Sequence, residues 1–378
     1  MTSLLLAGET PLPPNSGSRQ RTVHLARALA AALPVELAVL GPAGDCAGEP
    51  YPVTGVHHRR SRLAGLARSA RRPYGAAMAA SGALTALARA RRPVVAQAQA
   101  LWVMPAATAA GGAVVLDAHN VESDLLRRLA ADERRPLHRL RWRWEAGKTA
   151  AWERRAAVRA DAVCATSPDD AAAFERWGAR EVVLVPNGTD TAAVPHGPPP
   201  GGATLAYVGH YGYQPNAAAA LELAAEVLPR VRADVPEADA AIVGRDPTPA
   251  LRGAAGPHVR VTGTVPDVLP HLRTARALVV PLRSGGGTRL KVLEALAAGV
   301  PVISTPLGVE GLDLRDGEHV LVGRSSADLA ALAVRVIRDD ALAARLSAAG
   351  RARVEAAYDW AVVARPLVDL HLRLHTAR

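Results

Sequence analysis

The sequence of 378 residues is poor in cysteine, lysine and aromatic side chains. Its two cysteines, Cys46 and Cys164, are too few for a disulfide framework or a zinc site, and they fit a reducing cytoplasm. Aromatic residues make up 3% of the chain, and only two of the 45 basic residues are lysines, Lys148 and Lys291. Because arginine is used almost everywhere else, a lysine beside a glycine loop suggests that a compact point charge is needed there.

Signals for secretion and for membrane insertion are also missing. The first eleven residues have no basic segment, and their apolar run is too short for a signal peptide. Residues 93–116 carry no charge, but they contain glutamine, proline and glycine and are mostly alanine. We expect a strand, a helix and a strand there, inside a core. No Gly-x-Gly-x-x-Gly motif follows the first strand, which disfavours a Rossmann oxidoreductase.

The chain is long enough for two domains of about 180 residues each. Short apolar strands alternate with helical patterns in both halves, and a Pro/Gly-rich run at 195–202 is typical of a linker. We therefore predict an α/β protein with two doubly wound, Rossmann-like domains. The predicted domains are residues 1–196 and 197–358, followed by a C-terminal helix at 359–378.

Residues 277–312 carry the strongest local pattern. They predict a buried strand (277–282), a glycine loop (284–288), a helix (289–298) and a second buried strand (300–305). A helix N-terminus after a glycine loop offers free N–H groups and a positive dipole end to an anion. Arg289 and Lys291 oppose this dipole, so they are poor choices for stability alone. The pattern favours a phosphate or diphosphate site over a tight turn with a surface Lys291–Glu294 pair.

The same stretch resembles the donor-binding segment of the retaining, GT4-like glycosyltransferases of the GT-B fold (glycosyl transferases group 1). That family has two glutamates eight positions apart, the second followed by Ala-x-Ala-x-Gly. Glu294 and Gly299 match the second half of this signature, and Gly286 stands where the first glutamate is expected. The resemblance implies two Rossmann-like domains facing a central cleft, with donor contacts at Gly17, His210, Val265, Gly285, Gly286, Gly287, Thr288, Arg289, Leu290, Lys291 and Glu294.

A second motif, Asp117-Ala118-His119-Asn120-Val121-Glu122, follows a predicted strand. Alone, a histidine at a strand end is more often a capping or packing residue. The sequence resembles the N-domain motif of the same family, whose histidine lies beside the transferred sugar. The resemblance therefore implies a catalytic set of His119, Arg289 and Lys291. It also implies an acceptor side with Arg21, Asn120 and Glu122.

The family's usual cationic clamp is absent, because its positions are occupied by His210 and Asn216. The glycine loop, Arg289 and Lys291 are then expected to stabilise the leaving diphosphate. No Asp-x-Asp motif occurs, and the resemblance implies neither a metal ion nor a cofactor beyond the nucleotide-sugar substrate. With no candidate covalent nucleophile, we expect displacement at the front face of the sugar, with retention.

The net charge of +10 concentrates in two basic segments, 59–72 and 127–159. These segments suit an anionic acceptor, anionic lipid or nucleic acid, or they are solvated surface. We expect a nucleotide sugar and a glycan, lipid-linked or small natural-product acceptor as partners, and no nucleic acid. The expected location is the cytoplasm, with peripheral contact at the inner membrane face as an open alternative. An epimerase of the same fold and a non-catalytic basic binder are the competing functions.

Overall fold

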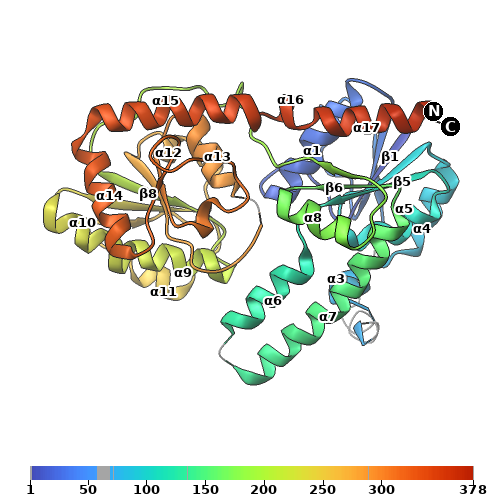
Figure 1. The fold of residues 1–378 in the computed structure, drawn as a ribbon, viewed down its shortest axis with the longest axis horizontal. Helices are drawn as coiled ribbons and strands as arrows, with labels where there is room; N and C mark the ends of the chain where they lie inside the picture. The colour runs from blue at the N-terminus through green and yellow to red at the C-terminus, as the bar shows by residue number, and fades with distance from the viewer. Residues whose placement is uncertain (1, 58–68, 71, 134, 288, 378) are drawn as a thin grey trace. The chain divides into compact units, whose positions relative to one another are not determined.

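The computed structural model describes residues 2–57, 69–70, 72–133, 135–287 and 289–377. It divides into two compact units (Figure 1). The first comprises Met1–Asn187, Gly286–Thr288 and Trp360–Arg378, and the second comprises Gly188–Gly285 and Arg289–Asp359. The predicted linker region belongs to the second unit, where Arg276 donates a hydrogen bond to the Pro200 carbonyl at 3.2 Å.

The first unit contains a sheet of seven described strands in the order β3-β2-β1-β4-β5-β6-β7, and every pair is parallel. The strands are β1 (Ser3–Ala7), β2 (Val35–Leu40), β3 (Val53–Val56), β4 (Val95–Ala98), β5 (Ala113–Ala118), β6 (Ala162–Ala165) and β7 (Val182–Leu184). The helices are α1 (Gly17–Ala30), α3 (Tyr74–Ala79), α4 (Gly82–Arg91), α5 (Met104–Ala109), α6 (Glu122–Asp132), α7 (Pro136–Arg159), α8 (Pro168–Arg176), α16 (Trp360–Val363) and α17 (Arg365–Thr376).

Both faces of this sheet are covered by helices. In β1, Leu5 and the α1 residue Leu25 belong to one core, which α17 completes with Leu367. Leu4 lies in the core on the other face, together with Leu84 of α4. Burial on both faces explains why the strands are continuous apolar runs rather than alternating patterns.

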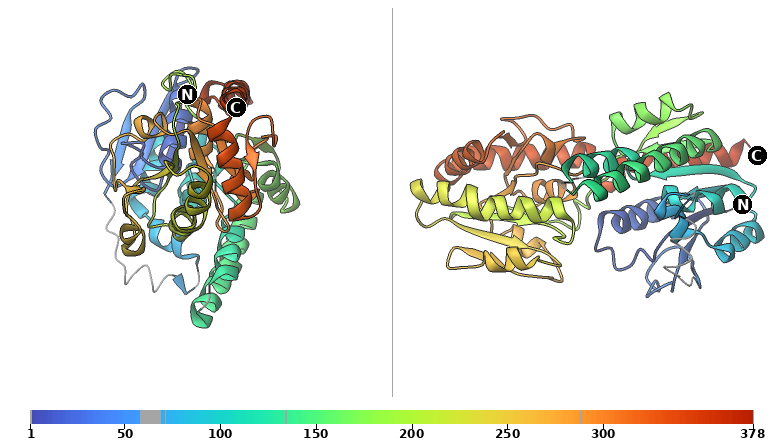
Figure 2. Two further views of the ribbon diagram at one scale, coloured as in Figure 1. Left: turned by 90° about the vertical axis from the view of Figure 1, so that its left-hand side faces the viewer. Right: turned by 90° about the horizontal axis from the view of Figure 1, so that it is seen from below.

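Helices α6 and α7 form an antiparallel hairpin that extends beyond the sheet of the first unit (Figures 1 and 2). The expected break at Pro136 is confirmed, since α7 begins there. At the base of the hairpin, Glu153 is buried and accepts the backbone N–H of Ser123 at 3.2 Å. The outer half of α7 is open to solvent, and Leu137 and Leu140 are 79% and 65% exposed.

The second unit contains a parallel sheet of six described strands in the order β10-β9-β8-β11-β12-β13. The strands are β8 (Thr204–Val208), β9 (Asp239–Val243), β10 (Val259–Val261), β11 (Ala277–Val280), β12 (Val302–Ser304) and β13 (Leu321–Val322). The helices are α9 (Gln214–Glu222), α10 (Leu228–Asp234), α11 (Pro249–Gly253), α12 (Leu269–Leu272), α13 (Leu290–Ala297), α14 (Ser326–Arg338) and α15 (Asp340–Ala357), with a π-helical turn at Leu223–Val227.

The prediction of two Rossmann-like α/β domains is confirmed by these sheets, because both have the strand order of a doubly wound fold. Two expected elements differ in extent. The strand expected at 259–265 ends at Val261. The helix expected from Val23 begins six residues earlier, at Gly17, which changes the environment of Arg21.

Candidate functional site

The glycine loop of the second half lies between β11 and α13, as the sequence predicts. β11 and β12 pair in parallel, so the loop leaves the carboxyl end of β11. Gly285 and Gly287 have φ angles of +96° and +88°, a region that disfavours side chains. A Cβ atom on Gly285 would lie 2.7 Å from the Tyr213 hydroxyl oxygen. Thr288, another expected donor contact, lies outside the described residues.

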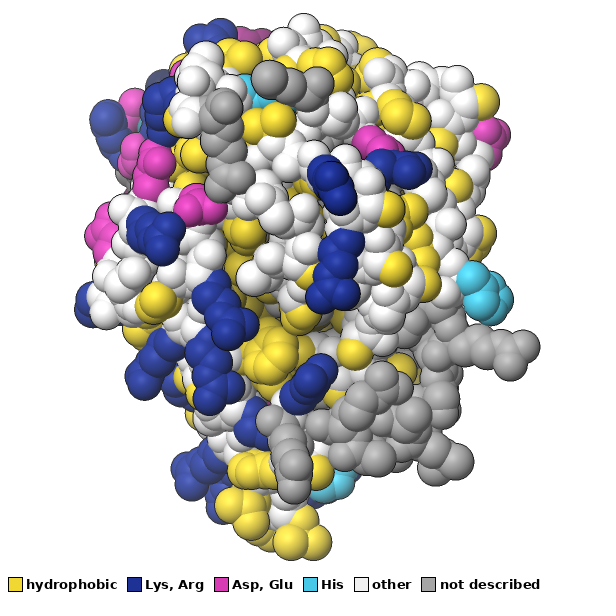
Figure 3. Space-filling model, turned by 90° about the vertical axis from the view of Figure 1, so that its right-hand side faces the viewer, with side chains coloured by type: hydrophobic (Ala, Val, Ile, Leu, Met, Phe, Trp, Pro, Cys, Tyr) yellow, Lys and Arg dark blue, Asp and Glu magenta, His cyan; other side chains and the backbone are white. Residues whose placement is uncertain are grey.

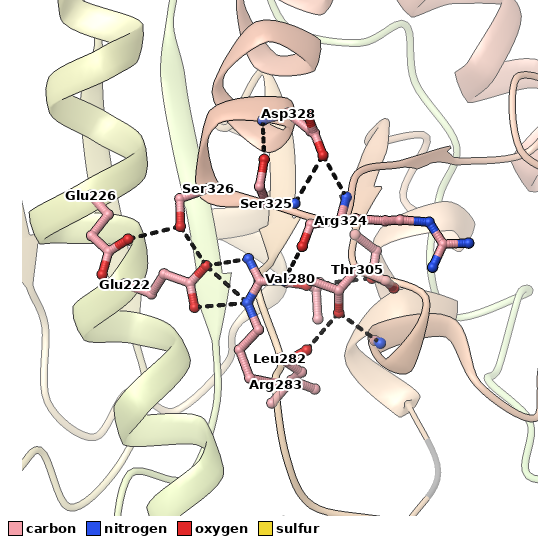
Figure 4. Close-up of polar contacts among 12 residues, drawn as sticks. Glu222, Glu226, Val280, Leu282, Arg283, Thr305, Arg324, Ser325, Ser326 and Asp328 are labelled. Atoms are coloured by element: carbon pink, nitrogen blue, oxygen red, sulfur yellow. Dashed lines mark hydrogen bonds and ion pairs between the residues drawn. The ribbon is translucent and has the colours of Figure 1, made fainter.

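A polar network holds the root of this loop (Figure 4). The Arg283 guanidinium bonds the Glu222 carboxylate of α9, with Nη2 and Oε1 2.6 Å apart. Ser326, the first residue of α14, donates to the same carboxylate at 2.8 Å. On the other side, the Thr305 hydroxyl donates to the Leu282 carbonyl at 2.6 Å. The loop is therefore tied at its base to two helices and to the end of β12.

Lys291 lies in the first turn of α13, and its ammonium group is desolvated. Nζ lies 2.9 Å from both Tyr207 Oη and Asn216 Oδ1, and 4.1 Å from the centroid of the Tyr207 ring. Burial, reinforced by the nearby charge of Arg289, lowers the pKa of Lys291 to about 7. No carboxylate among the described residues lies within ion-pair distance of this group. An anion placed here would meet a cation that has no carboxylate in direct contact among the described residues.

Arg289 and Glu294 lie on either side of Lys291 in the sequence. Arg289 is 5% exposed; its Nε–H donates to the Leu307 carbonyl at 3.0 Å, and Nη2 lies 3.8 Å from a Glu310 oxygen. Glu294 is half-buried one turn along α13, and its charge acts to raise the pKa of Lys291. The two expected cations therefore differ, because a carboxylate lies within ion-pair distance of Arg289, whereas Glu294 acts on Lys291 only from farther away.

The loop after β8 approaches the same lysine from the neighbouring strand. Asn216 connects the two, because its Nδ2 donates to the His210 carbonyl at 3.1 Å. The His210 ring faces solvent and lies 2.8 Å from Asp246. A Cβ atom on Gly244 would lie 1.8 Å from the Gly209 carbonyl oxygen, so the loops after β8 and β9 are in close contact. Leu290 and Val265 are partly buried against the core of this unit.

The first unit has its own cavity, of about 390 Å³, at the carboxyl ends of β1, β4 and β5. His119 and Glu122, which the sequence assigned to the catalytic and acceptor sets, both line it. Arg19 lines it as well and pairs with Glu9 at 2.9 Å. This edge of a parallel sheet is where open α/β folds bind ligands. Gly17, the first residue of α1, ends the loop that borders the cavity.

Arg21 has a different role from the expected acceptor contact. Because α1 begins at Gly17, Arg21 lies on the buried face of the helix and is 1% exposed. Its Nη2 lies 2.6 Å from Asp117 Oδ1, and its Nη1 donates to the Val185 carbonyl at 2.8 Å. We therefore correct the assignment: Arg21 is a buried partner of Asp117 and does not line the cavity.

The pair of Arg21 and Asp117 also lies next to His119. Burial raises the pKa of Asp117, but the Arg21 charge and the contact with His119 outweigh it and lower this pKa to about 2. Asp117 Oδ2 lies 3.5 Å from His119 Nε2, so a carboxylate that stays ionised faces the ring. The histidine that follows β5 therefore lines the cavity beside an ionised carboxylate.

Glu122 and Asn120 follow His119 at the start of α6. Asn120 Nδ2 donates to Glu122 Oε1 at 3.4 Å, and burial raises the pKa of Glu122. Burial also raises the pKa of Glu153, beneath them, to about 7. A carboxyl group with a raised pKa is suited to accept a proton or a hydroxyl hydrogen bond in the cavity.

Gln99, which sequence reasoning did not select, lines the same cavity and is 2% exposed. Both of its amide atoms are buried and have no hydrogen-bond partner among the described residues. Unpaired buried amides are costly, so the state of this side chain calls for an explanation. The signal available in the sequence was a glutamine within an otherwise uncharged apolar segment.

Comparison with known proteins identifies the family and the fold. Residues 15–193 match the model of Glycosyltransferase Family 4, and residues 202–339 match that of Glycosyl transferases group 1, so together they span most of the chain. The chain belongs to this glycosyltransferase family. Within the family, it is 32% identical over 209 residues to a phosphatidyl-myo-inositol mannosyltransferase of Mycobacterium leprae, covering 52% of this chain and 55% of that protein. The chain thus spans about half the length of the curated relatives it matches.

Solved structures confirm the GT-B fold. Sucrose-phosphate synthase from Thermosynechococcus elongatus superposes with a TM-score of 0.75 at 20% identity, over 100% of both chains. The Anabaena protein HepE in complex with UDP-glucose superposes with a TM-score of 0.69 at 14% identity, over 98% of this chain and 99% of that one. At these identities the likeness concerns the fold alone. Within the described ranges, no helix is both long and apolar enough to span a membrane.

Proposed function

We propose that the protein is a metal-independent glycosyltransferase that takes a sugar from a nucleotide-diphosphate donor and retains its configuration. The observation that supports this most strongly is Lys291. Its ammonium group is desolvated at the beginning of α13 and lacks a carboxylate partner within the described part of the chain. A donor diphosphate is an anion of the size and charge that such a group stabilises.

On the donor side, positive charges of the protein stabilise the leaving diphosphate. A departing diphosphate carries about two negative charges, and the end of α13 offers only about half a positive charge. Lys291 and Arg289 supply the remainder. Because negative charge increases as the glycosidic bond breaks, both groups stabilise the transition state more than the bound donor. Glu294 suits the vicinal hydroxyls of the ribose, since a carboxylate accepts two hydrogen bonds.

The acceptor side works through the cavity of the first unit. We assign the position beside the transferred sugar to His119, and acceptor hydroxyl contacts to Asn120 and Glu122. In the proposed front-face displacement, a phosphate oxygen of the donor takes the acceptor proton. Arg21 and Asp117 act as positioning residues, because Asp117, paired with Arg21, lies 3.5 Å from the His119 ring.

The acceptor, we propose, is a lipid-linked compound, a glycan or a small natural product, and the reaction takes place in the cytoplasm. The mycobacterial relative is named for a lipid acceptor. The exposed outer half of α7 supports peripheral contact with anionic membrane, since it carries apolar and basic side chains together.

A saturation-transfer screen against a panel of nucleotide sugars tests this function. We expect one or a few to bind the wild-type chain and the Lys148→Met variant, and to bind the Lys291→Met variant at least about tenfold more weakly. Lys148 is the matched control because it is the other lysine and lies on α7. Absence of binding by every donor would refute the proposal. Products formed from the donor alone, without an acceptor, would instead identify an epimerase.

A further inference from the structure

The acceptor cavity continues into a groove across the first unit. Next to it lies a second hollow of about 330 Å³, which shares Ala79 and Trp102 with the cavity. A third hollow of about 230 Å³ follows and shares Arg72 and Pro105 with the second. Because neighbouring hollows share wall residues, we treat them as one groove, running from His119 and Gln99 at one end to Trp152 of α7 at the other.

The inner and outer parts of this groove differ in charge. The cavity at its inner end contains both signs, with Glu9 and Glu122 beside Arg19. The two outer hollows are lined by four arginines and by no acidic residue among those described. The four are Arg72, Arg89, Arg155 and Arg159. Figure 3 shows basic side chains gathered on a face of the molecule, with apolar side chains between them.

None of these four arginines has an ion-pair partner within the described ranges, whereas many other arginines of the chain do. Arg155 and Arg159 are one helical turn apart on α7, a spacing at which like charges destabilise a helix. Arg72 is held near them because Lys148 donates to its carbonyl at 3.1 Å and its guanidinium lies 6.0 Å from the Trp152 ring centroid. This accumulation of unpaired cations favours an anionic ligand.

The surfaces between the arginines are apolar. The middle hollow is lined by Leu84, Val103 and Ala106, and the outer one by Met104, Pro105 and Trp152. A soluble anion such as a free sugar phosphate would leave these surfaces in contact with water. A ligand with both an anionic group and a hydrocarbon part would cover them, and each buried methylene group adds favourable free energy.

We propose that this groove binds the acceptor as an anionic lipid: a polyhydroxylated end reaches Gln99 and His119, the phosphate lies among Arg72, Arg155 and Arg159, and the hydrocarbon chain lies along the apolar wall of the outer hollow. The proposal rests on the proposed transferase function and narrows its acceptor to a lipid-borne phosphate. It also gives the buried, unpaired amide of Gln99 a partner, because an acceptor hydroxyl both donates and accepts hydrogen bonds.

The test uses the full chain and a short-chain phospholipid, dihexanoyl phosphatidylglycerol, kept below its micelle-forming concentration so that no membrane surface is present. Binding is measured by calorimetry. We expect the double variant Arg155→Gln/Arg159→Gln to bind it at least about tenfold more weakly than the wild type. The matched control is Arg141→Gln/Arg143→Gln, with the same charge change at exposed positions of the same helix outside the groove, and it should bind within about twofold of the wild type.

Two comparison ligands separate the sources of binding. Glycerol 3-phosphate has the anion without the chains, and we expect it to bind at least about tenfold more weakly. If glycerol 3-phosphate bound as tightly as the phospholipid, the groove would be a phosphate site only. If both double variants lost affinity equally, binding would depend on general surface charge and not on the groove. Either result overturns the proposal. Nucleotide-sugar binding, measured in the same samples, should be unchanged in both double variants. If the wild type bound no nucleotide sugar, the transferase function would be refuted, whatever the result for the groove.

Discussion

Replacing Lys291 with methionine should weaken donor binding and at the same time stabilise the unliganded protein. Methionine keeps the length of the side chain but has no charge. The pKa of Lys291 is about 7 in the folded chain, against 10.5 for a free lysine. The folded state therefore holds fewer protons than the unfolded state between these pH values, and the penalty is nearly complete at pH 7. A shift of this size corresponds to roughly 4 kcal/mol.

Removing the charge therefore stabilises the folded chain, but part of this stabilisation is offset because the contacts of the ammonium group are lost as well. Its hydrogen bonds to Tyr207 and Asn216 contribute on the order of 1–3 kcal/mol each. We therefore expect a midpoint of thermal unfolding that is unchanged or a few degrees higher at pH 7. This gain should shrink as the pH rises from 7 towards 10.5, and it should disappear above about pH 11, where Lys291 is neutral in both the folded and the unfolded chain. Donor affinity should fall at least about tenfold, since the diphosphate loses its cation.

Thermal unfolding and calorimetric titration of the same samples check both effects. Lys148→Met is the control. We expect it to lower the stability, because Lys148 pairs with Glu145 at 2.6 Å, and to leave the donor affinity at the wild-type value. If Lys291→Met lowered the unfolding midpoint by many degrees and left donor affinity unchanged, Lys291 would be a structural residue and the reasoning above would be wrong.

Three further predictions concern the supports of the site and the metal. Asp117→Asn should destabilise the chain by about 3–5 kcal/mol in denaturant unfolding, because it leaves the Arg21 charge buried. Wild-type stability should also fall as the pH drops from about 4 towards 2, because in this range the Asp117 carboxylate is protonated in the unfolded chain before it is protonated in the folded one. Gly244→Ala should cost about 2–4 kcal/mol and weaken donor binding, because its Cβ would meet the Gly209 carbonyl, whereas Gly253→Ala in α11, with open space around it, should be neutral. Transfer activity should persist in excess EDTA, because Lys291 and Arg289 meet the diphosphate charge; a strict need for added magnesium or manganese would contradict this.

The parts of the fold that the sequence predicted are those with local signals. The β11–loop–α13–β12 unit is visible in glycines and apolar periodicity within 30 residues, and the break at Pro136 follows from proline itself. Residues 41–92 carry few such signals, and β3 at Val53–Val56 was not anticipated. The basic positions 59, 60, 62, 68 and 71 of that segment lie outside the described residues.

The contacts that define the site are long-range, and no local pattern contains them. Arg21 meets Asp117 across 96 positions, so its burial could not be inferred from the loop in which it was placed. Lys291 is held by Tyr207 and Asn216, which precede it by 84 and 75 residues. The sequence showed Asn216 only as the position where relatives have a lysine. In the structure Asn216 accepts a hydrogen bond from Lys291 instead.

Proton uptake on donor binding tests the central claim most directly. A nucleotide-diphosphate sugar has no phosphate group titrating near pH 7, so uptake measured by calorimetry in two buffers reports on the protein. If the diphosphate meets Lys291 and raises its pKa from about 7 to 9 or above, about 0.7 proton should be taken up at pH 7.5. Affinity should accordingly weaken as the pH rises above 7. Binding without uptake, or with equal uptake by Lys291→Met, would contradict the claim that Lys291 holds the donor diphosphate.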